Sequence, residues 1–323
     1  MGKNYLILES NIMSHFTLRD IESLNNVKIF HHRKVTGNRF IDLLFNIHTS
    51  GKINKVINLP FKSIWNSILF NRWLKLNTPD YIIITASWYS DNIVSFFRQK
   101  KPKAKLFLRF TDKVSRGLYD VSELNIEKLR RQFDDVFVYS EEDSKKYNFT
   151  YLSVGYSALP ELQTNKSIRY DVVFIGADKG RLVQIRNAYK LFTEAGLSCF
   201  FYVAQVKQSE RINDGIIYAD RSLSFLEYLS YEMKAKCIFE IVQEGSTGRT
   251  YRMLEAIIYN KYLITNCKEI LSSKFYVDKY VMYYEKLEDI VLDYIKNASE
   301  DVNFEYNGEF SPLCSLEFIE NNY

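Results

Sequence analysis

The chain has 323 residues, which is more than one hydrophobic core usually organises, so two domains of about 150 residues each are expected. Hydrophobic residues make up 46% of the sequence and charged residues 25%, a balance that excludes wholesale disorder. The net charge of +4 comes from 43 basic and 39 acidic residues, which is too mild to indicate a nucleic-acid partner.

Cysteine usage and hydropathy indicate the compartment. The four cysteines are widely spaced and form no C-x-x-C pair, which is typical of reduced thiols in a cytosol. The N-terminus lacks the apolar region of a signal peptide, and no apolar run of about 18 residues predicts a transmembrane helix. We therefore expect a cytoplasmic protein.

The first half of the chain alternates short apolar runs with stretches of helical spacing. The runs are rich in β-branched and aromatic residues and predict strands at 5–8, 27–31, 81–85, 105–110 and 136–139. Helical spacing at 91–99 and 122–132 favours crossover helices between parallel strands. Residues 1–155 are therefore expected to form a Rossmann-like domain.

Apolar residues at i, i+3 and i+4 spacing over residues 61–76 predict an amphipathic helix. Packing against the first sheet is its default role. However, Trp65 and Trp73, together with the basic run 98–105, also suit contact with an anionic membrane. That alternative would place the protein peripherally at the inner face of the membrane.

The alternation of strands and helices restarts after residues 156–169, which contain Pro160 and show no clear period, as expected of a linker. Within a second domain at 170–300, strands are predicted at 170–175, 199–203, 236–242 and 261–265. Helices are predicted at 181–195 and at 287–298, and a further helix is predicted to end near residue 259. Ligands of open α/β sheets lie beyond the carboxyl ends of the strands. The loops that follow these strands should therefore face a cleft between the two domains.

The segment 243–256 (QEGSTGRTYRMLEA) lies between a predicted strand and a predicted helix. Gly245 and Gly248 allow the backbone to turn tightly and to approach a ligand closely. Thr247 or Thr250 can cap the helix, whose free N–H groups and positive dipole end suit a phosphate. This pattern predicts an anion pocket at the start of the helix.

Charged side chains follow in the same segment. Arg249 and Arg252 offer positive charge that a diphosphate can accept in a bidentate manner. Glu255 lies further along the helix, where its carboxylate could accept hydrogen bonds from the hydroxyls of a ribose. The alternative is that these three residues form ordinary i, i+3 surface pairs.

The run EGSTGRTYRMLEAIIYNKYLITN resembles the donor-site signature of GT-B glycosyltransferases, especially those of bacterial capsule and lipopolysaccharide synthesis. The runs YDVVFIGADKGRL and DDVFVYSEEDSKKYNFTYL resemble the start of that group's C-terminal domain and the strand and helix before its linker. The likeness covers most of residues 133–270. It implies an α/β fold of two Rossmann-like domains facing each other across a cleft: an N-terminal acceptor domain, a C-terminal nucleotide-sugar domain, and a final segment at 301–323 that crosses back to the first.

By position, the resemblance matches Glu255 to the carboxylate that binds the donor ribose, and Gly248, Arg249 and Thr250 to the diphosphate-facing helix start. The loop after the first strand of the second domain is a further donor contact. The implied donor site comprises Gly176, Lys179, Arg181, Glu244, Gly245, Gly248, Arg249, Thr250, Arg252 and Glu255. The retaining members carry a second glutamate eight residues before the ribose carboxylate, where this chain has Thr247. Retention or inversion of the anomeric centre therefore stays open.

An inverting transfer needs a general base near the acceptor hydroxyl. His15, in the loop after the first strand, is one candidate, although an isolated histidine is more often a surface or capping residue. Asp112 is the rival, with a turn or helix cap as its plainer role.

Three residues at the ends of predicted strands or just after them are candidates for binding the acceptor. Trp88 and Tyr89 could stack on an acceptor sugar, with packing at a domain interface as the alternative. Arg109, near Asp112, could bind the acceptor.

No D-x-D triplet occurs in the chain, which argues against donor chemistry that requires a metal, and no nicotinamide or P-loop glycine motif occurs either. We therefore expect no cofactor other than the nucleotide sugar as co-substrate. The expected function is transfer of a sugar from a nucleotide diphosphate donor to a lipid-linked surface polysaccharide. The alternatives are a two-lobed sugar or nucleotide binding protein without catalysis, and a sugar-nucleotide epimerase.

Overall fold

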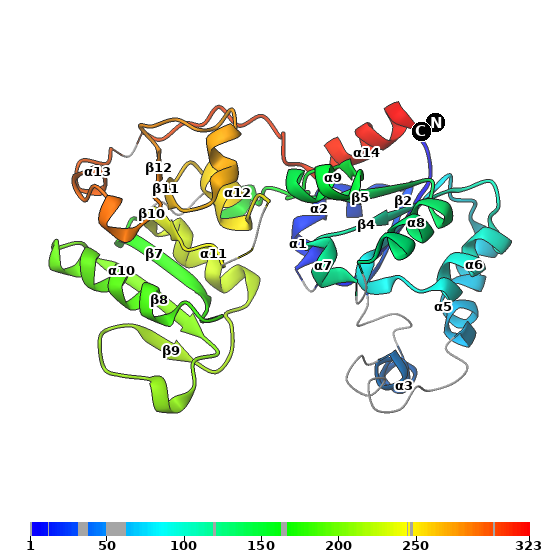
Figure 1. Cartoon of the computed structure of the whole chain (residues 1–323), viewed down its shortest axis with the longest axis horizontal. Coiled ribbons are helices and arrows are strands. Elements are labelled where there is room, and N and C mark those ends of the chain that lie inside the picture. Colours follow the sequence, from blue (N-terminus) through cyan, green and yellow to red (C-terminus); the bar gives the residue numbers. More distant parts are fainter. Residues whose placement is uncertain are drawn as a thin grey trace. The chain divides into compact units, whose positions relative to one another are not determined.

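The computed structural model describes residues 2–11, 13–31, 38–49, 63–118, 121–162, 167–243, 245, 248–299 and 301–323. The chain divides into two compact units, one formed by Met1–Ser157 with Phe310–Tyr323 and the other by Ala158–Glu309 (Figure 1). Each unit is built on a six-stranded sheet. All neighbouring strands in both sheets pair in parallel, which confirms the predicted α/β class with two Rossmann-like domains.

The sheet of the first unit has the strand order β2-β1-β3-β4-β5-β6. Its strands are β1 (Tyr5–Glu9), β2 (Val27–His31), β3 (Tyr81–Thr85), β4 (Lys105–Arg109), β5 (Asp135–Val138) and β6 (Thr150–Tyr151). The predicted strands are present with boundaries that agree to within one residue, and β6 is additional. The agreement reflects near-continuous apolar runs, which a parallel sheet covered on both faces requires.

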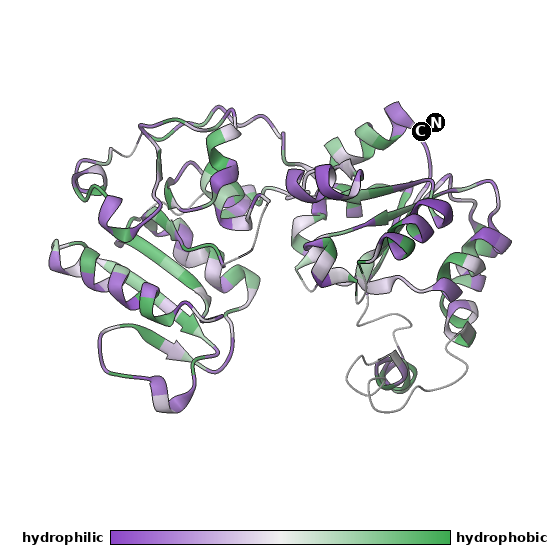
Figure 2. Cartoon of the chain, viewed as in Figure 1, coloured by the Kyte–Doolittle hydropathy of each residue, from purple (hydrophilic) through white to green (hydrophobic). Residues whose placement is uncertain are grey.

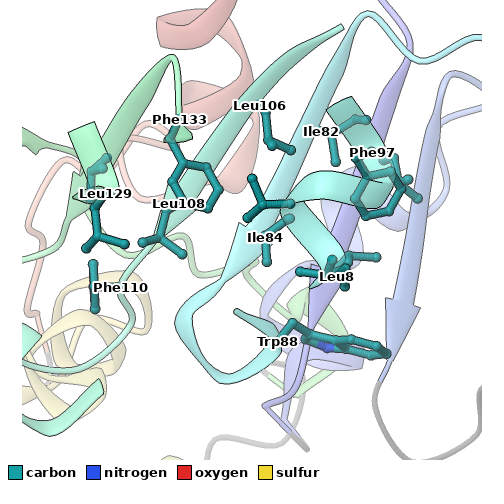
Figure 3. Close-up of a cluster of buried hydrophobic side chains, with 14 of the residues drawn as sticks. Leu8, Ile82, Ile84, Trp88, Phe97, Leu106, Leu108, Phe110, Leu129 and Phe133 are labelled. Carbon is teal, nitrogen blue, oxygen red and sulfur yellow. The ribbon is translucent and has the colours of Figure 1, made fainter. Parts of the chain in front are cut away.

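Helices cover both faces of this sheet. They are α1 (Ser14–Thr17), α2 (Arg19–Glu22), α3 (Arg39–Thr49), α5 (Ser63–Leu76), α6 (Asp91–Lys100), α7 (Val114–Gly117), α8 (Glu123–Gln132), α9 (Glu141–Tyr147) and α14 (Pro312–Asn322). Alternate residues of each strand point to opposite faces. Leu8, Ile84 and Leu108 lie on one face with Phe97 of α6 and Leu129 of α8 (Figure 3).

The opposite face is covered partly by the last helix of the chain. Tyr5 and Ile7 of β1 pack there with Leu316 and Ile319 of α14. The Tyr5 hydroxyl donates to the Leu316 carbonyl at 3.2 Å. Ser311 caps α14 through a bond from the Leu313 amide, and Pro312 occupies its first turn. The C-terminal segment is therefore an integral part of the first core.

The sheet of the second unit has the strand order β12-β11-β10-β7-β8-β9. Its strands are β7 (Tyr170–Ala177), β8 (Cys199–Ala204), β9 (Ile217–Ala219), β10 (Ala235–Glu240), β11 (Tyr262–Thr265) and β12 (Val281–Tyr283). Its α-helices are α10 (Leu182–Glu194), α11 (Phe225–Met233), α12 (Tyr251–Ile258) and α13 (Asp293–Lys296). Figure 2 shows β7 and β8 mainly apolar and α10 alternating between apolar and polar residues, which is typical of a helix with one face on a sheet.

The predicted helix at 287–298 is wrong as a continuous element. The structure has a 3-10 turn at Leu287–Asp289 and the short α13, separated by Ile290 in an extended conformation. The Asp289 carboxylate accepts the backbone N–H groups of Glu285 and Lys286 and so holds the turn locally. Ile290 is buried in the second core in this extended conformation.

Candidate functional site

The centre of the second sheet is a point where the strand order reverses. The chain runs outward from β7 through β8 to β9, and then returns to place β10 on the other side of β7. In open α/β sheets, ligands bind beyond the carboxyl ends of the strands at such a point. The loops that follow β7 and β10 are therefore the first place to look for a ligand site.

The loop after β7 is a tight turn that leads into α10. Asp178 accepts the backbone N–H groups of Arg181 and Leu182, at 3.0 and 2.9 Å, and so caps the start of this helix. Lys179 and Gly180 both have positive φ, at 47° and 80°. Gly176 lies in β7 itself, where an added Cβ would meet the Phe174 ring at 3.3 Å.

Two arginines connect the loops of β7 and β10. Arg181 donates to the Ala177 carbonyl at 2.6 Å and also to the carbonyl of Ile241, just beyond β10. Arg252, from α12, donates in the other direction to the Ile175 carbonyl of β7. Donor candidates from two stretches of sequence are therefore brought to one edge of the second sheet.

The glycine-rich loop before α12 has the backbone that its sequence predicts. Gly245 has φ of 72° and Gly248 has φ of 92°, in the left-handed region that glycine adopts without a Cβ penalty. Thr250 caps α12 by accepting the Met253 amide at 3.2 Å, which confirms one of the two predicted caps. Glu244 and Thr247 lie outside the described residues.

A carboxylate already contacts this loop. The backbone N–H of Gly248 donates to the side chain of Glu269, which lies in the 3-10 segment after β11. Arg249 is half-buried beside it at the entry to α12. An anionic group therefore accepts one N–H of the loop, as a phosphate would.

Glu255 lies inside the unit rather than on an exposed helix face. Its side chain has no exposed surface, and the Tyr228 hydroxyl of α11 donates to it. Arg252 lies with its guanidinium 5.1 Å from the centre of the Tyr228 ring and its Nε 3.9 Å from an oxygen of Glu232. The interpretation of Glu255 as part of a surface ion pair is therefore wrong, whereas its predicted contact with a ribose stays a prediction.

Two further buried carboxylates, which the sequence interpretation did not identify, border Glu255. Burial raises the pKa of Glu232 well above its usual range, and the neighbouring Glu255 adds to this rise while Arg252 opposes it. Burial also raises the pKa of Glu240 at the end of β10, against hydrogen bonds from Thr250 and Thr265. Glu240 could have been identified from the sequence, because it directly follows the apolar run Cys237–Phe239 in a strand expected to be buried.

The candidate base His15 lies in the first unit, in α1. Its side chain is 55% exposed, and its Nδ1 is 3.1 Å from Oε1 of Glu22. Asp112 is exposed, accepts the Lys113 amide at 2.8 Å and pairs with Arg116 at 3.3 Å. The contacts of Asp112 are those of a residue in a local turn, which is its plainer role. The carboxylate of Glu22 lies where it can orient the His15 ring.

The acceptor candidates are held within the first unit. Trp88 is buried in the core against Phe45, and its Nε1 donates to the Glu9 carbonyl at 3.1 Å. A stacking role for Trp88 is therefore wrong, because both the ring and its polar atom are engaged inside the unit. Tyr89 is half-buried and donates to Gln132 at 2.8 Å, and Arg109 is buried and donates to the Ser153 carbonyl at 3.3 Å.

No protein-family model matches the chain, and no match is found among curated proteins. Solved structures are similar over nearly all of it. An alpha-glucosyltransferase in complex with UDP-glucose and DNA containing an abasic site is 13% identical, with a TM-score of 0.55 over 93% of this chain and 91% of that one. The lipopolysaccharide outer core galactosyltransferase WaaB is 12% identical, with a TM-score of 0.51 over 98% and 99%. A trehalose-6-phosphate synthase is 8% identical, with a TM-score of 0.51 over 98% and 94%.

The chain has the GT-B fold. At these identities the likeness concerns the fold, and the function has to be argued from the site. Within the described part of this GT-B chain, no helix combines the length and apolar character needed to cross a bilayer.

The buried carboxylates predict a pH dependence of stability. Above the ordinary glutamate pKa of 4.5, Glu232 stays protonated in the folded state while it ionises in the unfolded state. The unfolded state then binds fewer protons, so stability falls as pH rises through this window toward the folded-state pKa. Glu232→Gln cannot ionise, and we expect it to show a smaller loss of unfolding free energy than the wild type between about pH 5 and pH 8.

Urea denaturation across this pH range measures the effect. Glu227→Gln is the matched control, because Glu227 lies on the same helix, is exposed and has a lowered pKa, which restricts its contribution to more acidic pH. Parallel pH profiles for the wild type and Glu232→Gln would contradict the assignment.

Proposed function

We propose that this protein transfers a sugar from a nucleotide diphosphate donor to a glycan acceptor, with the donor bound in the second unit. The observation that carries the proposal is the left-handed glycine loop that leads into the capped start of α12, beside the reversal of strand order. The GT-B fold supports it, as does the UDP-glucose bound by one of the similar proteins.

The donor diphosphate would bind where the Gly248 N–H now contacts Glu269. A phosphate there would replace the carboxylate, and Arg249 would add positive charge at the helix entry. Fixed donors and charges of this kind stabilise the negative charge that develops on a departing diphosphate. The leaving group would thus be stabilised by this chain's own residues.

His15 is the better of the two candidate bases. With its Nδ1 hydrogen held by Glu22, the ring presents the lone pair of Nε2, which can accept the proton of an acceptor hydroxyl. Asp112 is already paired with Arg116. The contact with Glu22 therefore favours His15 as the base, with its ring oriented by a carboxylate.

The glycine loop gives the first test. Gly248→Ala and Gly196→Ala both place a Cβ at positive φ, 92° and 80°, so each should destabilise the fold by about 1–2 kcal/mol. Only Gly248→Ala should also weaken the binding of a nucleoside diphosphate, by at least about tenfold, because Gly196 follows α10 away from the proposed loops. Calorimetric titration with UDP and with GDP measures the difference. If the two variants bind UDP and GDP with equal affinity, the loop is not part of the donor site.

Glu255→Gln tests the proposed ribose contact. The amide keeps the shape of the side chain but accepts hydrogen bonds from the ribose hydroxyls less strongly than a carboxylate does. We therefore expect nucleotide affinity to fall at least about tenfold. Glu227→Gln is again the control. If Glu255→Gln alters the melting temperature and leaves the nucleotide dissociation constant unchanged, the role of Glu255 is structural.

Turnover separates the proposed activity from the two alternatives. A transferase releases the nucleoside diphosphate only as sugar reaches an acceptor, an epimerase converts the donor alone, and a binding protein does neither.

A membrane-bound acceptor is favoured by an apolar stripe on α3. Its members recur at i, i+3, i+4 and i+7, and their exposed fractions are Phe40 67%, Leu43 55%, Leu44 43% and Ile47 43%. Phe45, on the other side of the helix, packs against Trp65 of α5. Exposed cations Arg39, Arg72 and Lys75 on α3 and α5 suit anionic head groups.

The tryptophans that suggested this contact in the sequence face inward. Trp65 and Trp73 are partly buried against the first core, and Trp65 donates to His48 at 2.7 Å. Helix α5 thus packs against the first core, which is the default role expected for it. We propose that the exposed apolar stripe of α3 contacts the membrane that holds a lipid-linked acceptor.

Replacing Phe40, Leu43 and Ile47 together with serine tests this surface. We expect the wild type to sediment with vesicles that contain phosphatidylglycerol and the triple variant to stay in solution, because the insertion of apolar side chains is lost. Leu124→Ser with Val183→Ser, which removes exposed apolar residues from α8 and α10, is the control and should bind as the wild type does. Wild-type protein that stays in solution would contradict the membrane proposal.

A further inference from the structure

Three side chains of types that can ligate a metal come together from separate elements of the first unit. They are His15 in α1, Glu22 at the end of α2 and His31 at the end of β2, and one ligand atom from each lies within 4.8 Å of the others. His15 Nδ1 and His31 Nε2 are each 3.1 Å from the same oxygen, Oε1 of Glu22. The imidazole rings are stacked with their centroids 3.7 Å apart. Two rings therefore direct a nitrogen at one carboxylate oxygen.

The second nitrogen of His31 determines which form of the ring faces Glu22. Ser14 Oγ donates its proton to the Asn11 carbonyl at 2.6 Å, and it lies 2.8 Å from His31 Nδ1. Because a hydroxyl has a single proton, Ser14 Oγ accepts from Nδ1–H of His31. A neutral His31 then presents the lone pair of Nε2 to a carboxylate oxygen. That contact is repulsive unless a proton or a metal cation lies between the two atoms.

The spacing suits a metal ion. Two ligand atoms that are each about 2.1 Å from a tetrahedral zinc ion lie about 3.4 Å apart. The two nitrogen-to-oxygen distances here are 3.1 Å, so each needs a shift of only a few tenths of an ångström to match that spacing, and the two nitrogens lie within 4.8 Å of each other. Histidine and glutamate are zinc ligands, and Ser14 holds the outer nitrogen of His31 in the way that orients a ligating imidazole.

We propose that His15, Glu22 and His31 bind one divalent transition-metal ion of the zinc class. A neutral imidazole with a metal on Nδ1 carries its proton on Nε2, so a metal-bound His15 has no lone pair there to accept a proton. The ion would therefore inhibit a transfer that uses His15 as base. This consequence rests on the proposed function, whereas the binding of the ion does not.

Zinc binding by the full chain tests the site without any sugar substrate. Protein freed of metal with a chelator is titrated with Zn²⁺ near neutral pH by calorimetry, and bound zinc is counted by mass spectrometry after gel filtration. We expect one equivalent for the wild type, binding at least about tenfold weaker for His15→Ala, Glu22→Gln and His31→Ala, and about 10–100-fold weaker for Ser14→Ala. His48→Ala, a histidine on α3 bonded to Trp65, should bind as the wild type does.

His15 and Glu22 are exposed, so their substitutions should leave the fold intact, which circular dichroism checks. Zinc binding that is equal in the wild type, His15→Ala and Glu22→Gln would overturn the proposal. A wild type that binds no zinc would overturn it too. Neither result bears on nucleotide binding in the second unit.

Discussion

The candidate donor site depends on two arginines that cross between neighbouring strands. Arg252 of α12 donates to a carbonyl of β7, and Arg181 at the start of α10 donates to a carbonyl just beyond β10. Each arginine thus ties the loop of one strand to the backbone of the other. Because β7 and β10 adjoin where the strand order reverses, this crossed pair fixes the two loops that a nucleotide would contact.

The arginine of α12 also offsets the cost of buried acid groups. Glu232, Glu240 and Glu255 are all buried, and three ionised carboxylates at such spacing would repel one another in a medium that screens charge poorly. The raised pKa of Glu232 and Glu240 relieves part of that repulsion, and the charge of Arg252 relieves more. Buried ionisable groups with perturbed pKa values cluster at functional sites.

Much of the fold could be predicted from the sequence, because strands of a parallel sheet covered on both faces are continuous apolar runs. Helix α11 was missed although its capping box, Ser224 with Glu227, is legible in the sequence. Trp88 was misjudged because position after a strand does not reveal whether a ring turns inward. The meeting of His15 with His31 could not be predicted either, since it depends on the path of β2 beside β1.

The same fold serves a glucosyltransferase, a galactosyltransferase and a trehalose-6-phosphate synthase, all at 13% identity or less to this chain. Fold alone therefore cannot select the donor, and selection has to come from side chains on the two loops. In this chain those loops present Lys179 at positive φ and Arg249 at the helix entry, and Glu269, from the segment after β11, accepts the Gly248 amide. A donor bound there, as proposed, would have to supply an anionic group able to displace that carboxylate. This requirement favours a diphosphate over an uncharged sugar, because only a charged group restores the electrostatic balance that Glu269 now provides.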